Sequence, residues 1–168
     1  MARGTFIVID GIDGSGKGTQ TDLLIERLVR EGHRAVKADF PQYGKKSAGA
    51  VEEYLNGKYG DTYDVSPYVA SLFYAVDRFD ASFKINAALS AGKLVLANRY
   101  VPSNAAHQGA KIKDQMERKK FLTWINDLEY GILKLPRPDL IIFLHVPAEI
   151  GYDLILKKAK REHLEGKK

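Results

Sequence analysis

Short apolar runs alternate along this chain with longer segments in which apolar residues recur every three or four positions. The short runs are rich in β-branched residues and predict buried strands, whereas the longer segments predict amphipathic helices. Ser66 before Pro67 is a typical helix start, and Gly32 and Gly92 stand where two helices should end. The predicted strands are Thr5–Asp10, Arg34–Ala38, Leu94–Asn98 and Leu140–His145, and the predicted helices are Lys17–Glu31, 44–58, Pro67–Ala91, Asp114–Tyr130 and a segment from Ala148.

The alternation of strands and helices predicts an α/β fold of one domain, with a parallel sheet covered by helices on both faces. Ligands of such sheets gather at the carboxyl ends of the strands. The residues expected to meet there are Asp10, Phe40, Asn98 with Arg99, and His145.

Composition narrows the function classes. The chain has 168 residues, of which 45% are hydrophobic and 28% charged, as in an ordinary globular domain. It has no cysteine, which excludes a disulfide scaffold, a thiolate metal site and a cysteine nucleophile. The longest apolar runs, Phe6–Ile9 and Leu140–Leu144, are too short for a membrane span or a signal peptide. We therefore expect a cytoplasmic enzyme or binding protein.

The positive charge is concentrated at one end of the sequence. The formal net charge is +5, but residues 157–168 alone carry six Lys or Arg and two Glu. The remainder is nearly neutral, so the charge does not indicate a nucleic-acid partner. Residues 157–168 are either a solvated helix end or a functional basic segment.

A glycine-rich segment between the first predicted strand and helix carries the most specific chemistry. Glycines let backbone N–H groups curl around a phosphate, the following helix N-terminus adds partial positive charge, and a lysine reaches the outer phosphates. The alternative is a strand-to-helix turn without a ligand, which the flanking elements disfavour. The segment fits G-x-x-x-x-G-K and consists of Gly11, Ile12, Asp13, Gly14, Ser15, Gly16, Lys17, Gly18 and Thr19.

One position departs from the usual phosphate loop. A Ser or Thr directly after the lysine commonly binds Mg²⁺, but here Gly18 takes that place and Thr19 comes one residue later. We therefore expect Mg²⁺, the cofactor that accompanies ATP, to be held mainly by nucleotide phosphates and water.

The ending Gly16–Gln20 resembles nucleoside monophosphate kinases, and three further segments narrow the resemblance. They are Phe40-Pro41, the segment FYAVDR at 73–78, and NRYVPSNAAHQ at 98–108. In this order they resemble the thymidylate kinase family, over about residues 4–165. The resemblance implies a three-layer α/β/α P-loop NTPase fold, transfer of phosphate from ATP to thymidine monophosphate (dTMP) in dTTP biosynthesis, and a homodimer packed through the long helices. It implies no nucleic-acid or membrane partner.

The resemblance also implies roles for individual residues. Lys17, Arg99 and Asp13 would serve the chemistry, and Arg78 and Arg99 would hold the acceptor phosphate with planar, permanently charged guanidinium groups. Tyr74 would stack on thymine. The substrate-binding set is Phe40, Pro41, Phe73, Tyr74, Arg78, Arg99, Ser103, Asn104, His107 and Gln108.

Without the resemblance, plainer interpretations stay open for several of these residues. Phe73 and Tyr74 could both be core aromatics, and Arg78 could form a surface ion pair with a neighbouring aspartate. His107 alone is more typical of a hydrogen-bonded structural histidine than of a catalytic one. The bond before Pro41 can be cis, as X-Pro bonds allow.

Asn98 is a second departure, because the family usually has Asp before this arginine. Asn keeps an acceptor oxygen but loses the charge, so either Asp13 or Asn98 would meet Mg²⁺ through water and no direct protein ligand is expected. The resemblance predicts that Asn98→Asp raises the rate of phosphoryl transfer.

The basic segment acquires a role through the resemblance. Some family members place an arginine in the phosphate loop where this chain has Gly14, and others supply the cation from a basic lid. A lid at about residues 157–168 is therefore implied, with Lys157, Lys158, Lys160 and Arg161 as its candidate cations. The family continues with a fifth strand and a final helix, whereas only four strands are predicted here.

Three functions remain open on the sequence alone. The first is an active thymidylate kinase, the second a nucleotide-binding protein without turnover, and the third a kinase for another nucleoside monophosphate.

Overall fold

The computed structural model describes the backbone of residues 2–164 and the side chains of residues 2–157. Its four strands form one parallel sheet in the order β2-β3-β1-β4. The strands are β1 (Phe6–Gly11), β2 (Ala35–Asp39), β3 (Leu94–Asn98) and β4 (Leu140–Leu144). All four lie within one residue or so of the predicted segments, and the α/β fold with a parallel sheet is confirmed.

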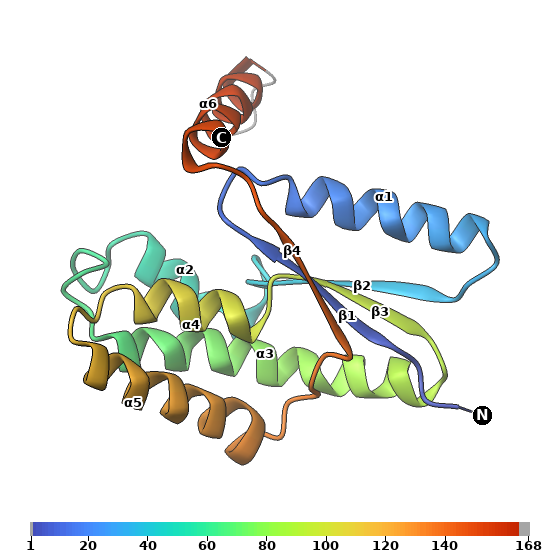
Figure 1. The fold of residues 1–168 in the computed structure, drawn as a ribbon, viewed down its shortest axis with the longest axis horizontal. Helices are drawn as coiled ribbons and strands as arrows, with labels where there is room; N and C mark the ends of the chain where they lie inside the picture. The colour runs from blue at the N-terminus through green and yellow to red at the C-terminus, as the bar shows by residue number, and fades with distance from the viewer. Residues whose placement is uncertain (1, 165–168) are drawn as a thin grey trace.

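Helices cover both faces of the sheet, giving the predicted three layers (Figure 1). Helix α1 (Lys17–Arg30) packs on one face, and α3 (Pro67–Ser90) and α4 (Val101–Gly109) pack on the other, with α5 (Gln115–Asn126) beside α4. The short α2 (Gly49–Leu55) lies against α3. Helix α6 (Ala148–Leu164) follows β4 and stands off the sheet near the start of α1.

The ends of α3 follow directly from its sequence. The Ser66 hydroxyl accepts a hydrogen bond from the Tyr68 N–H, and Pro67 occupies the first turn, where no N–H is needed. Gly92, with φ +70°, follows the last turn in the left-handed conformation that ends many helices. The predicted length of this helix is therefore confirmed.

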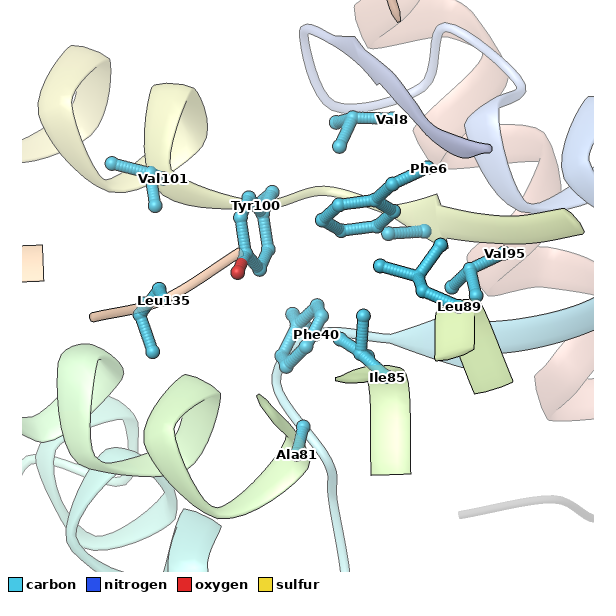
Figure 2. Close-up of a cluster of buried hydrophobic side chains, with 11 residues drawn as sticks. Phe6, Val8, Phe40, Ala81, Ile85, Leu89, Val95, Tyr100, Val101 and Leu135 are labelled. Atoms are coloured by element: carbon cyan, nitrogen blue, oxygen red, sulfur yellow. The ribbon is translucent and has the colours of Figure 1, made fainter. Parts of the chain in front are cut away.

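The main core lies between the sheet and α3 (Figure 2). Three aromatic rings meet there: Phe6 packs edge-on against Tyr100 at 5.0 Å between centroids, and Phe40 lies 5.5 Å from the same ring. The buried Tyr100 hydroxyl donates to the Pro136 carbonyl, so its burial leaves no unpaired hydrogen-bond donor. This packing fixes the carboxyl ends of β2 and β3, where Phe40 and Tyr100 follow the strands.

Two helical segments differ from the sequence prediction. Residues 101–109 form α4, which the sequence did not predict, and the segment after α5 continues as a π-helix, Asp127–Ile132. π-Helical turns often occur at functional sites because they re-aim side chains. Here the π-helix contains the completely buried Glu129.

No helix in the described part of the chain combines the length and the apolar character needed to cross a membrane.

Candidate functional site

The predicted phosphate loop connects β1 to α1 and has the backbone that its glycines allow. Gly14 and Gly16 adopt φ values of +78° and +81°, a region that other residues avoid. Lys17 begins α1 with its side chain buried, and its Nζ donates to the Ile12 carbonyl at 2.6 Å. Burial, and then the nearby Arg99, lower the pKa of the Lys17 ammonium. The backbone of the loop therefore surrounds the desolvated ammonium group of Lys17.

The phosphate loop also packs closely against helix α6. A Cβ atom added to Gly14 would lie 2.1 Å from the Gly151 carbonyl oxygen, and one added to Gly151 would lie 3.0 Å from the Asp13 carbonyl oxygen. Two backbones approach each other at this point with no room for a side chain on either. This contact explains why Gly14 carries no side chain, and its partner, Gly151, was not predicted from the sequence.

Two alanine substitutions separate packing from ligand binding in this loop. Gly14→Ala should lower the free energy of unfolding by more than about 2 kcal/mol, because the left-handed backbone alone costs about 1–2 kcal/mol and the clash with Gly151 adds to it. Gly16 has nearly the same φ as Gly14, but no described atom lies within 4 Å of a Cβ added there. Gly16→Ala should therefore lower the free energy of unfolding by less than Gly14→Ala does.

Urea denaturation measures the two stabilities, and calorimetric titration with ATP measures binding. Gly16→Ala should lose ATP affinity, since alanine disfavours the left-handed backbone that orients the N–H groups of the loop. Equal destabilisation by the two substitutions would contradict the close contact between Gly14 and α6.

A cavity of about 790 Å³ opens beside this loop, at the carboxyl ends of the strands. It is bounded by the loop, by the end of β2, by α3 and by α4, so segments distant in sequence share one site, as the sheet rule predicted. Strand β4 contributes Ile141 and Phe143 rather than His145. The predicted residues that line it are Gly11, Ile12, Asp13, Phe40, Pro41, Tyr74, Arg78, Arg99, Ser103, Asn104, His107 and Gln108.

Arg99 stands between the loop and α4. Its NH2 pairs with Asp13, and its NH1 donates to the Ser103 hydroxyl at 3.1 Å. Its backbone is left-handed, with φ +66°, a rare conformation for a residue with a side chain. The Arg99 N–H donates to the Ile9 carbonyl and helps hold this conformation. The strained backbone turns the guanidinium back across the strand ends toward the phosphate loop.

His107 lies on the other side of Arg99, with its Nε2 3.3 Å from NH1 of that arginine. Burial, and then the Arg99 charge, lower the pKa of the imidazole. At neutral pH the ring is therefore uncharged and Nε2 can accept a hydrogen bond from Arg99. This hydrogen bond orders the ring beside Arg99 on the wall of the cavity, and the predicted place of His107 in the substrate-binding set stays a prediction.

Arg78 has a partner that the sequence did not predict. Its Nε donates to Glu129 Oε2 at 2.7 Å and its NH2 pairs with Oε1 of the same carboxylate. Arg78 is 2% exposed and Glu129 is completely buried. Asn104 donates to Glu129 as well, at 3.2 Å. One edge of the Arg78 guanidinium is thus occupied, and only its remaining part faces the cavity.

Phe73 and Tyr74, which are neighbours on α3, differ in whether they line the cavity. Tyr74 lines the cavity, and burial raises the pKa of its phenol to about 12, so the ring stays neutral. Phe73 does not line the cavity: its ring packs 6.1 Å from that of Tyr54 and 5.5 Å from that of Tyr59. Phe73, one of the predicted substrate-binding residues, is therefore not among the residues that line this cavity.

Comparison with known proteins decides the family. The sequence profile described as thymidylate kinase matches residues 9–168. The chain belongs to the thymidylate kinase family. Thymidylate kinase of Mycobacterium tuberculosis is 32% identical over 157 residues, which cover 93% of this chain and 72% of the relative. Human thymidylate kinase is 32% identical over 144 residues, covering 86% and 62%.

The fold comparison agrees. The structure of thymidylate kinase from Candida albicans superimposes with a TM-score of 0.72 at 29% identity, and the match covers 90% of this chain and 67% of that one. The P-loop NTPase fold expected from the family is therefore confirmed for the described residues.

Three oxygens in the thymidylate kinase site bear on the metal that the family implies. Asp10 Oδ2, Ser15 Oγ and Asn98 Oδ1 are buried and have no hydrogen-bond partner among the described residues. Asp10, which the sequence placed at this end of the sheet without a role, lines the cavity, and its other oxygen accepts from the Gly11 N–H and from the Ser103 hydroxyl at 2.7 Å. Unpartnered hard oxygens beside a phosphate loop fit a hydrated Mg²⁺.

The remaining predicted residues fall into two groups. Thr19 is exposed, and Gly18 lies close to Asn98. Lys157 is exposed on α6, while the side chains of Lys158, Lys160 and Arg161 lie outside the described residues. The peptide bond between Phe40 and Pro41 is cis.

Proposed function

We propose that this chain transfers the γ-phosphoryl group of ATP to thymidine monophosphate, and that Arg99 joins the donor and acceptor halves of the site. The observation that carries the proposal is the position of Arg99. Its guanidinium contacts Asp13 of the phosphate loop and Ser103 of the acceptor side within the same cavity. An arginine placed between two phosphates can stabilise the charge that develops on the moving phosphoryl group.

The donor would bind the phosphate loop. The loop N–H groups and the N-terminus of α1 attract its phosphates, and Lys17 would leave the Ile12 carbonyl for a phosphate oxygen. Such an exchange is favourable because a desolvated ammonium gains more from an anion than from a neutral carbonyl. When bound with ATP, Mg²⁺ would neutralise charge on the phosphates. Asp10 and Asn98, which have unpartnered oxygens, would hold its water shell together with Asp13, the loop carboxylate that pairs with Arg99.

The acceptor would bind between Tyr74 and α4. The Tyr74 ring offers a neutral stacking face, and Phe40 and Pro41 supply an apolar wall. Asn104 Oδ1 and Gln108 Oε1 are buried and lack hydrogen-bond partners among the described residues. A pyrimidine edge carrying an N–H would satisfy such an oxygen. Arg99, rather than Arg78, is the principal cation for the acceptor phosphate in this proposal, since Glu129 already occupies one edge of Arg78.

The chemistry itself needs little from acid or base groups. An acceptor phosphate oxygen attacks in line, and the transition state spreads charge over the oxygens of the moving group. Lys17, the loop N–H groups and Arg99 stabilise that charge because they are already oriented around it. The basic segment that begins within α6 would exclude water as a lid, with Lys157, Lys158, Lys160 and Arg161 as its cations.

A coupled assay of ADP release across the nucleoside monophosphates tests the function. Turnover with thymidine monophosphate, and much less with the purine monophosphates, is the expected result. A purine acceptor as the preferred substrate, or ATP binding without turnover of any acceptor, would contradict it.

We also infer a homodimer formed through α3. Leu72, Val76, Phe79 and Phe83 follow one another at intervals of three or four residues and are 40–65% exposed, forming one apolar stripe along the helix. Stripes of this kind usually mark protein interfaces.

Phe83→Glu should therefore convert a dimer into a monomer, as measured by light scattering after size-exclusion chromatography. Lys84→Glu, on the next residue and outside the stripe, is the matched control and should stay dimeric. A dimer that persists in Phe83→Glu would show that this stripe is not the interface.

A further inference from the structure

Asn98 is held by a carboxylate on the neighbouring strand. Asp39 and Asn98 are paired residues at the carboxyl ends of β2 and β3, and Asn98 Nδ2 donates to Asp39 Oδ1 at 3.1 Å. The other Asp39 oxygen accepts from Lys37 Nζ at 2.8 Å, and the same lysine contacts Asp22 of α1 at 2.7 Å. Asp39 is thus held by Lys37 at one carboxylate oxygen and meets Asn98 with the other.

This contact determines which way the Asn98 amide faces. A carboxylate only accepts hydrogen bonds, so the NH₂ group must face Asp39 and the carbonyl oxygen must face away from it. That oxygen, Oδ1, is buried and has no hydrogen-bond partner among the described residues. A buried acceptor that has no donor raises the free energy of the folded protein. A bound ligand that supplies the donor removes this cost.

The amide lies against the start of α1. A Cβ added to Gly18, the residue after Lys17, would lie 3.8 Å from Asn98 Nδ2. Where many phosphate loops carry a hydroxyl side chain, this chain therefore has open space beside the Asn98 amide. The amide group that carries the free oxygen therefore lies beside the residue that follows Lys17 at the end of the phosphate loop.

We propose that Asp39 is a positioning residue that locks the Asn98 amide, so that its free oxygen accepts a hydrogen bond from the water shell of metal-bound ATP. This proposal rests on the proposed phosphoryl transfer, because it assigns a task to the same site. Asp39 itself touches neither substrate: it acts through Asn98.

The proposal reverses one expectation from the sequence. Asn98→Asp was expected to raise the rate, but it would place two carboxylates about as close as the present 3.1 Å contact. Like charges at such a distance repel and destabilise the folded site. An aspartate at position 98 is tolerated only when position 39 can donate to it, as an asparagine there would.

Four variants and one control test the proposal. They are Asp39→Ala, Asp39→Asn, Asn98→Asp, the exchange Asp39→Asn with Asn98→Asp, and the control Asp22→Asn. The control removes the other carboxylate on Lys37 but leaves Asn98 untouched. Affinity for Mn²⁺ with ATP is measured by electron paramagnetic resonance, thermal unfolding is followed without nucleotide, and kcat is measured against Mg²⁺ concentration.

Asp39→Ala should weaken Mn²⁺ binding in the presence of ATP by about tenfold and raise the Mg²⁺ requirement, as the loss of an outer partner of a metal site commonly does. Asp39→Asn should bind nearly as well as the unmodified protein, because its amide oxygen still accepts from Asn98. Asn98→Asp should lower both the unfolding temperature and the affinity, and the exchange should recover both.

Unchanged metal affinity in Asp39→Ala would overturn the proposal, and so would an exchange variant no better than Asn98→Asp. Failure of the proposed function is distinguishable, because the metal-binding and unfolding measurements need no turnover. If the unmodified protein bound Mn²⁺ with ATP but phosphorylated no acceptor, these two measurements would still decide the role of Asp39.

Discussion

Replacing Arg99 by alanine is expected to lower kcat about 10³-fold, because the cation that neutralises charge on the moving phosphoryl group is lost. The fold should survive. Arg99 gives up a pair with Asp13, a carboxylate that is 62% exposed and can be hydrated by solvent instead. Steady-state kinetics with ATP and thymidine monophosphate at saturation measures the effect, and thermal unfolding shows whether the protein remains folded.

Two variants sharpen this result. Arg99→Lys keeps the charge but loses the planar fork that reaches Asp13 and Ser103 together, so an intermediate kcat is expected. Arg27→Ala, which breaks an exposed pair with Glu31 on α1, is the control for removing an arginine and should keep full activity. Near-normal turnover in Arg99→Ala would contradict the central place given to this residue.

The second large effect concerns the buried ion pair between Arg78 and Glu129. Glu129→Gln should lower the free energy of unfolding by about 3–5 kcal/mol, since it leaves the Arg78 guanidinium buried without a counter-charge. Urea denaturation measures the loss. Glu117→Gln, which breaks an exposed pair with Lys120, is the matched control and should show no measurable loss.

Replacing both partners separates stability from binding. Arg78→Met with Glu129→Leu should recover most of the stability, because apolar side chains of similar size can replace a buried ion pair at little cost. The same variant should raise the KM for thymidine monophosphate, since Arg78 lines the cavity. If the double variant stayed as unstable as Glu129→Gln, burial of an uncompensated charge would not be the cause.

The parts of the fold that were predictable are those specified by nearby residues. The strand, loop and helix of the phosphate site follow from one continuous motif, and α3 follows from Ser66-Pro67 at its start and Gly92 at its end. In contrast, α4 was missed: its sequence contains Pro102 and several polar residues, and no apolar periodicity marks it.

The site residues that escaped prediction depend on contacts between distant segments. Glu129 lies 51 positions from Arg78 and carries no motif of its own, and its burial becomes evident only once α3 and the π-helix pack together. Gly151 meets Gly14 across more than a hundred residues. Phe73 and Tyr74 were assigned together because the sequence could not show which of the two faces the cavity.

The pairing of Arg99 with Asp13 has a consequence for selectivity. In the unliganded site the guanidinium already has an anionic partner, so an incoming anion must displace a carboxylate before it gains this contact. A free phosphate or sulfate ion brings nothing else to offset that exchange. In the proposed acceptor site, a nucleotide would also bring its base to Tyr74 and its ring edge to Asn104 and Gln108, and these contacts would contribute further binding energy. Because this exchange lowers the affinity for every phosphate alike, an inorganic anion is left with weak binding, and the contacts to the base decide which ligand occupies the site.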